Sequence, residues 1–177
     1  MKVVAQPFEG ILVIEPKRFE DERGFFLESF EIERYRALGV TETFVQGNHS
    51  RSKKNVLRGL HFTRKKPQAQ LLTVMHGRVF DVVVDIRKES FTFGQWFGTE
   101  LSADGVSQIY MAHGFAHGFC VLSDCADLHY QVSHKYDSND ESGLIWNDPC
   151  VGIYWPVRTP FLSIRDASFG SLNEISI

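Results

Sequence analysis

The sequence has no apolar run that could cross a membrane: no window of its 177 residues approaches the roughly 18 apolar residues that a transmembrane helix needs. Its first ten residues also lack the charged-then-apolar pattern of a signal peptide. A strong charge of one sign is missing too, since the formal net charge is −3. That balance argues against nucleic acid as a main partner. We therefore expect neither a membrane nor a nucleic-acid partner.

Cysteine is scarce as well. The three cysteines, Cys120, Cys125 and Cys150, are an odd number with no CxxC spacing. This usage favours reduced, partly buried thiols and a cytoplasmic location over a disulfide framework or a zinc site.

Aromatic residues are plentiful. Hydrophobic residues make up 43% of the chain and charged residues 23%, which predicts one globular domain over residues 1–177. Fifteen phenylalanines help bring the aromatic share to 13%. They fit a thick β core, an aromatic-walled ligand cavity, or both.

Short strand patterns follow one another at spacings of 8–12 residues, with turns rather than helices between most of them. The predicted strands cover residues 10–15, 25–30, 43–50, 55–63, 68–75, 78–85, 96–101, 107–111, 116–121, 126–133 and 153–155. One helix is expected from residue 29 or 30 to 38, with Ser29 as N-cap and Gly39 just past its end. Residues 135–147 read as a polar loop, and residues 159–172 could hold a single helical turn. The pattern predicts an all-β antiparallel sandwich or barrel.

Seven histidines raise the question of a metal site. His113 and His117, with His61 upstream, could form a site at a barrel mouth. A small-barrel metal site, however, usually has a second histidine two residues after the first, where this chain has Thr63. The cations that follow Thr63 at positions 64–66 would repel a metal ion. We therefore expect no metal and no other cofactor.

His61 lies in an apolar run three residues after Arg58. It could be an ordinary core histidine, or a base that takes a proton from a substrate. The second interpretation gains weight because Tyr130, on a later strand, could donate a proton. Arg23 and Arg58 adjoin glycines, which suits guanidinium groups that turn inward to bind phosphate.

Several motifs occur in order along the chain and together resemble the dTDP-4-dehydrorhamnose 3,5-epimerase family of nucleotide-sugar epimerases. The resemblance runs from about residue 7 to 172. It rests on residues 19–28 (FEDERGFFLE), 46–50 (QGNHS), 57–62 (LRGLHF), 79–87 (VFDVVVDIR), 114–119 (GFAHGF) and 146–149 (WNDP).

The resemblance implies a cupin-type jelly roll that works as a metal-free homodimer, with an active site inside each barrel. The implied substrate is dTDP-4-dehydro-6-deoxy-D-glucose, a nucleotide sugar. The resemblance also implies a catalytic base, its partner acid and a proton donor on the opposite face: His61, Asp166 and Tyr130, respectively. The positions that match residues binding substrate, diphosphate or nucleotide are Phe19, Arg23, Phe26, Glu28, Gln46, Asn48, Arg58, His117 and Tyr136, some of them expected from the other subunit. We add Arg165, beside Asp166, and Gln70 to the substrate-binding set.

The chain departs from the family pattern near His61. The family usually has glutamine where this chain has Thr63, and a lysine that helps hold the developing enolate oxygen before the next strand. That lysine is missing here, and Gln70, Lys65 or Lys66 would have to substitute for it. His113 and His129 add polar groups near the site. A different hexose, a different nucleotide such as CDP, or inversion at one carbon only would each fit these changes.

Three other functions are compatible with the fold. A sugar 3,4-ketoisomerase is one, although Thr63 stands where a second histidine would be expected. A metal-dependent cupin oxygenase is another. The third is a sugar-binding cupin without catalysis, which the joint presence of His61, Tyr130 and Asp166 argues against.

Overall fold

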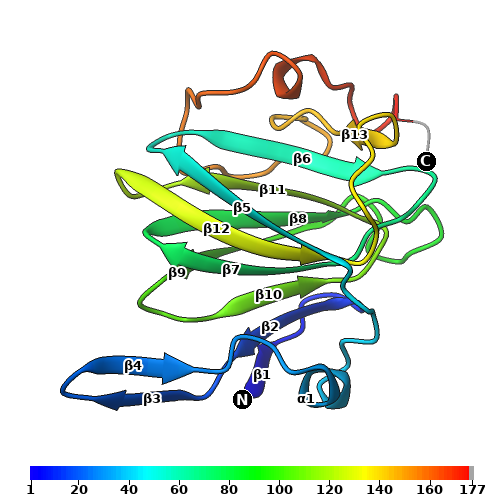
Figure 1. Ribbon diagram of the computed structural model, residues 1–177. Coiled ribbons are helices and arrows are strands. Elements are labelled where there is room, and N and C mark those ends of the chain that lie inside the picture. Colours follow the sequence, from blue (N-terminus) through cyan, green and yellow to red (C-terminus); the bar gives the residue numbers. More distant parts are fainter. Residues whose placement is uncertain (176–177) are drawn as a thin grey trace.

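The computed structural model describes residues 1–175 as two antiparallel β-sheets packed face to face (Figure 1). The first sheet has the strand order β1-β2-β10-β7-β12-β5, and the second has the order β13-β6-β11-β8-β9. A separate hairpin, β3-β4, extends to one side of the sandwich (Figure 1). The elements are β1 (Lys2–Ala5), β2 (Ile11–Glu15), β3 (Arg18–Asp21), β4 (Gly24–Leu27), α1 (Ile32–Ala37), β5 (Gln46–Lys53), β6 (Leu57–Thr63), β7 (Gln70–His76), β8 (Arg78–Asp85), β9 (Trp96–Ser102), β10 (Gln108–Met111), β11 (Phe115–Val121), β12 (Cys125–Val132), β13 (Glu141–Gly143) and the 3₁₀ turn η1 (Asp166–Ser168). This is the antiparallel sandwich that the strand pattern predicts and the cupin-type jelly roll that the resemblance implies.

Apolar side chains fill three layers. Successive side chains on a strand point to opposite faces, so the inner faces of both sheets meet in a core that includes Leu72, Val83 and Ile109. The outer face of the first sheet is covered by α1, whose Tyr35 is fully buried there. The outer face of the second sheet packs against the C-terminal segment, which includes Leu172. Each sheet is therefore packed on its outer face as well as on its inner face.

The helix is shorter than predicted and has a different N-cap. Glu31, not Ser29, caps α1, because its carboxylate accepts hydrogen bonds from the backbone N–H groups of Glu33 and Arg34. Such a cap is typically worth about 1 kcal/mol. The backbone carbonyl of Ser29 instead accepts from Tyr35 and Gln108. Gly39 follows the last turn with a φ of +101°, as predicted for the residue past the helix end.

Two strand predictions and one loop prediction need correction. The strand predicted over residues 25–30 is β4, which covers Gly24–Leu27 and pairs with the unpredicted β3. The predicted strand at residues 153–155 does not form. Residues 135–147 are not a plain loop, because β13 pairs there with β6.

None of the helices within residues 1–175 is long and apolar enough to cross a membrane. Cys120 is buried, Cys125 is half-buried and Cys150 is exposed, and all three are free thiols.

Candidate active site

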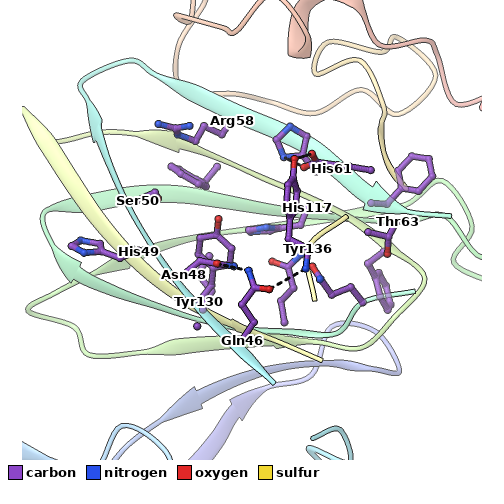
Figure 2. Close-up of a pocket in the computed structure, with 18 of the residues that line it drawn as sticks. Gln46, Asn48, His49, Ser50, Arg58, His61, Thr63, His117, Tyr130 and Tyr136 are labelled. Atoms are coloured by element: carbon purple, nitrogen blue, oxygen red, sulfur yellow. Dashed lines mark hydrogen bonds and ion pairs between the residues drawn. The ribbon is translucent and has the colours of Figure 1, made fainter. Parts of the chain in front are cut away.

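A cavity of about 590 Å³ lies between the two sheets. The six-stranded sheet supplies one wall through β5, β7 and β12, and the five-stranded sheet supplies the other through β6 and β11 (Figure 2). The lining residues are Gln46, Gly47, Asn48, His49, Ser50, Arg58, His61, Phe62, Thr63, Gln68, Gln70, Leu72, Phe115, His117, Phe119, Tyr130, Tyr136, Glu141 and Arg165. Its walls are therefore both polar and aromatic, as is typical of small-molecule sites.

A bulge in β6 brings Arg58 and His61 into the same cavity. In a regular strand, two residues three apart point to opposite faces. Here His61 pairs with His117 and Arg58 pairs with Phe119, so β6 has one more residue than β11 over this stretch. Gly59 has a φ of +129°, and a side chain at this position would lie 2.5 Å from the Cα atom of Gly118. The glycines of these two motifs thus allow the close strand approach that turns both side chains inward.

His61 is held by a buried carboxylate. Its Nε2 lies 2.8 Å from Oδ1 of Asp166, which is almost fully buried in η1. Burial by itself raises the pKa of Asp166, but the hydrogen bond and charge of His61 hold that pKa below its ordinary value. Since Asp166 occupies Nε2, Nδ1 is the ring nitrogen free to take a proton from a substrate.

His117 forms a second pair with an aspartate. Its Nε2 lies 2.9 Å from Oδ2 of Asp81, and both residues are buried. Oδ1 of Asp81 is also buried and has no hydrogen-bond partner within residues 1–175. His117 lines the cavity with its ring beside that of Phe119.

Tyr130 faces His61 from the other sheet. It lies on β12 with Leu128 on the inner face, as the alternation predicts. Burial raises the pKa of Tyr130, although the positive charge of Arg58 offsets part of this effect. The phenol therefore keeps its proton at neutral pH and can deliver it to a substrate in the cavity.

Four amide side chains line the cavity, and three of them are tied to other groups. Gln46 donates to Asn48 and accepts from the backbone N–H of Tyr136, and Gln68 donates to the backbone of His134. The side-chain amide of Gln70 lines the cavity and makes no hydrogen bond to another side chain or to the backbone among the described residues. No lysine lines the cavity within residues 1–175, because Lys65 and Lys66 are exposed and lie outside it. Gln70 is thus the neutral donor available where the family usually has a cation.

Arg58 and Arg165 supply the positive charge. Arg58 donates from Nε to Oγ of Ser52, 2.9 Å away, and Arg165 donates to the carboxylate of Glu141. Glu141 also accepts a 2.9 Å hydrogen bond from the hydroxyl of Tyr136. All of these except Ser52 line the cavity, so two guanidinium groups are available to a diphosphate.

The cavity and its immediate surroundings contain ten of the fourteen residues predicted from the sequence. Nine line it, and Asp166 reaches it through His61. The other four lie outside it, on or just after the hairpin: Phe19, Arg23, Phe26 and Glu28. The Arg23 side chain is 90% exposed and bound to Asp21, so in a single chain it does not turn inward as expected. Glu28 binds Arg34, 2.9 Å away.

Glu141 is the main site residue that the sequence did not reveal. It lies in the polar segment predicted to be a loop, and no periodic pattern marks the three-residue strand that places it. Ser50 and Thr63 also line the cavity. Ser50 could have been found from its alternation with Gln46 and Asn48.

Comparison with known proteins agrees with this geometry. The family model described as dTDP-4-dehydrorhamnose 3,5-epimerase matches residues 5–174. A protein of that name from Salmonella typhimurium is 48% identical over 98% of this chain and 97% of its own length. A dTDP-4-dehydrorhamnose 3-epimerase from Streptomyces niveus is 42% identical over 89% of this chain and 77% of its own length.

A solved structure shares the same architecture. The dTDP-6-deoxy-D-glucose-3,5-epimerase from Legionella pneumophila, crystallised with dTDP-4-keto-L-rhamnose, superimposes with a TM-score of 0.95 at 45% identity. The match covers 99% of this chain and 94% of that one. The chain therefore belongs to the dTDP-4-dehydrorhamnose 3,5-epimerase family of isomerases.

Proposed function

We propose that the protein converts dTDP-4-dehydro-6-deoxy-D-glucose to dTDP-4-dehydro-L-rhamnose by inverting C3 and C5. The observation that supports this most is the His61–Asp166 pair, which faces the cavity from one sheet while Tyr130 faces it from the other. Inversion needs a base on one side of the sugar ring and an acid on the other. The two sheets supply one of each.

The 4-keto group makes this chemistry accessible. It acidifies the C–H bonds at both neighbouring carbons, because the carbanion formed at either carbon is an enolate. His61 takes the proton at Nδ1, and Asp166 stabilises the resulting imidazolium from Nε2. Tyr130 then delivers its proton to the opposite face of the same carbon. No redox step is involved, so the mechanism needs no cofactor.

The enolate oxygen needs a hydrogen-bond donor. Gln70 is free to donate through its amide, and it faces the cavity from β7 beside the strand of Tyr130. Because this amide is free and faces the cavity, we assign Gln70 to the oxygen at C4. A neutral donor stabilises an oxyanion less than a cation would, since hydrogen bonds between two charged groups are stronger.

The remaining lining residues suit the rest of the ligand. Arg58 and Arg165 can bind the two phosphates, since guanidinium groups bind phosphate oxygens bidentately. His117 lies beside His61 in the strand register, and because Nε2 donates to Asp81, its Nδ1 can accept a hydrogen bond from a sugar hydroxyl. Gln46, Asn48 and Tyr136 offer amide and hydroxyl groups for the nucleotide.

We propose that two chains form a homodimer in which the hairpin of each completes the cavity of the other. Phe19 and Phe26 pair across β3 and β4 and remain 53% and 70% exposed, which is costly for aromatic side chains in a monomer. Arg23 at the tip and Glu28 beyond the hairpin would then reach the nucleotide in the partner cavity.

We also infer that residues 1–177 act as one domain in the cytoplasm, a reducing compartment that suits the free thiols.

Subunit mixing tests the shared site. His61→Asn disables a cavity, and Arg23→Ala combined with Phe26→Ala disables a hairpin, so each variant alone should be inactive. Random exchange of subunits should then restore about a quarter of the wild-type activity, because half of the dimers would contain one intact site. Mixing without recovery would show that the hairpin does not act in trans.

Deuterium exchange tests the reaction itself. The protein is incubated in D₂O with dTDP-4-dehydro-6-deoxyglucose, and deuterium at C3 and C5 is followed by NMR. We expect incorporation at both carbons and formation of the L-rhamno product. Exchange at C3 alone would make the protein a monoepimerase like its Streptomyces relative. Exchange with only the CDP-linked sugar would reject the dTDP substrate, and exchange with neither would reject the epimerase function.

A further inference from the structure

A second carboxylate, Glu141, lies beside the catalytic histidine. Its Oε1 is 3.7 Å from Nδ1 of His61, and its side chain is only 13% exposed. This is the ring nitrogen that Asp166 leaves free. Glu141 is placed there by β13, which pairs with β6 so that Gly143 lies opposite His61 and Glu141 lies opposite Thr63.

His61 thus lies within a cluster of charges drawn from several elements. Asp166 in η1 bonds to Nε2, and Arg165 lies just before it, with Nε 3.9 Å from the Asp166 carboxylate. Glu141 approaches Nδ1 from β13. His117 on the neighbouring β11 is the remaining titratable group in register with His61, and its Nε2 faces Asp81. Two carboxylates and one guanidinium therefore surround the imidazole most closely.

We propose that Glu141 is a positioning residue that tunes His61 as a base, an inference that rests on the epimerase function proposed above. When His61 takes a proton, positive charge appears on a ring that has a carboxylate at each nitrogen. A negative group within about 4 Å favours the protonated form of such a base. Asp166 fixes the ring and one nitrogen, while Glu141 stabilises the charge at the nitrogen that receives the proton.

The other contacts of Glu141 keep it in place for this role. Oε2 accepts hydrogen bonds from the hydroxyl of Tyr136 and from Arg165, which leaves Oε1 directed toward His61. Tyr136 and Arg165 also line the cavity. A substrate that contacts either of them therefore also acts on the Glu141 carboxylate beside His61.

The test compares pH profiles of kcat/KM for deuterium exchange in four proteins. The wild type should show a rising limb, because His61 must be neutral to act as the base. Glu141→Gln removes the charge but keeps the size of the side chain. It should move this limb about one unit to lower pH, since the imidazolium loses a stabilising neighbour. It should also lower the plateau about tenfold, because a weaker base removes the proton more slowly.

Two further variants separate charge from structure. Glu141→Asp keeps the negative charge and should leave the limb near its wild-type position. Glu42→Gln is the matched control: Oε1 of Glu42 also lies 3.7 Å from a histidine Nδ1, that of His113, but outside the cavity. It should leave the profile unchanged.

Three results of these pH profiles can be told apart. A limb that moves in Glu141→Gln but not in Glu141→Asp or Glu42→Gln supports the proposal. A limb that stays in place in Glu141→Gln overturns it, even if activity falls, because that residue would then serve only to hold Tyr136 and Arg165. A wild type that exchanges with no nucleotide sugar would instead overturn the epimerase function on which the inference rests.

Discussion

Two histidine–aspartate pairs are built on neighbouring strands of the same sheet. His61 and His117 are direct partners in the β6–β11 register, and their Nε2 atoms lie 2.8 and 2.9 Å from Asp166 and Asp81. By distance alone the two pairs are equivalent. Their surroundings differ: the His61 side chain is 26% exposed and that of His117 is 10% exposed.

The surroundings decide what each pair can do. Asp81 lies deep between strands, with one carboxylate oxygen buried and unpartnered within the described residues. Asp166 lies on the separate turn η1 next to Arg165, and it contacts His61, whose other ring nitrogen lies near Glu141. A proton taken by His61 can be stabilised by several charges and returned to water. We therefore propose that His61 removes the proton and that His117 binds the substrate.

The largest difference between the pairs is expected when each histidine is replaced by asparagine. His61→Asn should lower kcat about 10⁴-fold, at the upper end of what a general base contributes. His117→Asn should mainly raise KM, because it removes a hydrogen-bond partner of the sugar. Steady-state product formation followed by NMR would measure both. Equal losses of kcat in the two variants would contradict the assignment.

Replacing Tyr130, the proposed proton donor on the opposite wall, should have the next largest effect. Tyr130→Phe should lower the rate of inversion about 10³-fold, because no proton is delivered to the far face. Deuterium exchange should persist, since His61 can still remove a proton and return a solvent deuteron to the same face. Comparing exchange with product formation in this variant separates the two steps. Loss of exchange together with inversion would place Tyr130 in proton removal.

Replacing the two aspartates should affect different properties. Asp166→Asn should lower kcat/KM about 10²-fold, since the imidazolium loses its partner. Asp81→Asn should lower the free energy of unfolding by roughly 2 kcal/mol, because it disturbs the buried hydrogen bond between His117 and the carboxylate that accepts it. Kinetics and urea unfolding of both variants would reveal the contrast. A stable Asp81→Asn protein with severely reduced kcat would reverse the roles of the pairs.

The smallest expected effect is on acid stability. The pKa of Asp166 is lower when folded than when unfolded, so its ionised form stabilises the folded state. This contribution is complete above the ordinary pKa of about 3.9 and is lost as the pH falls through the lower, folded pKa. The free energy of unfolding should therefore decline less between pH 5 and pH 3 in Asp166→Asn, by about 1 kcal/mol. Parallel declines in both proteins would contradict this.

Most strands of the sandwich could be predicted from the sequence, because apolar residues recur at the positions of each strand that point into the core. Residues 78–85 were predicted as a strand, and β8 has those bounds. The hairpin strand β3 was missed, since Arg18–Asp21 is largely charged and mostly exposed and has no alternating apolar face. The three-residue β13 was missed because its position depends on pairing with β6 rather than on its own pattern.

The site was partly visible in the sequence for similar reasons. Motif likeness and alternation identified His61 and Tyr130, both of which line the cavity. Alternation alone would have separated Arg58 from His61, and only the bulge at Gly59 brings them together. Glu141 approaches His61 through a tertiary contact, which no local pattern reports.

The central claim is that a proton leaves to His61 on one wall and another arrives from Tyr130 on the opposite wall. A single-turnover reaction of dTDP-4-dehydro-6-deoxyglucose in D₂O tests it most directly, with deuterium at each inverted carbon measured by NMR. We predict one solvent deuteron at every inverted carbon, because the group that delivers the proton is not the one that removed it. Retention of the original hydrogen at an inverted carbon would contradict the account, since a single group would then have carried it from one face to the other.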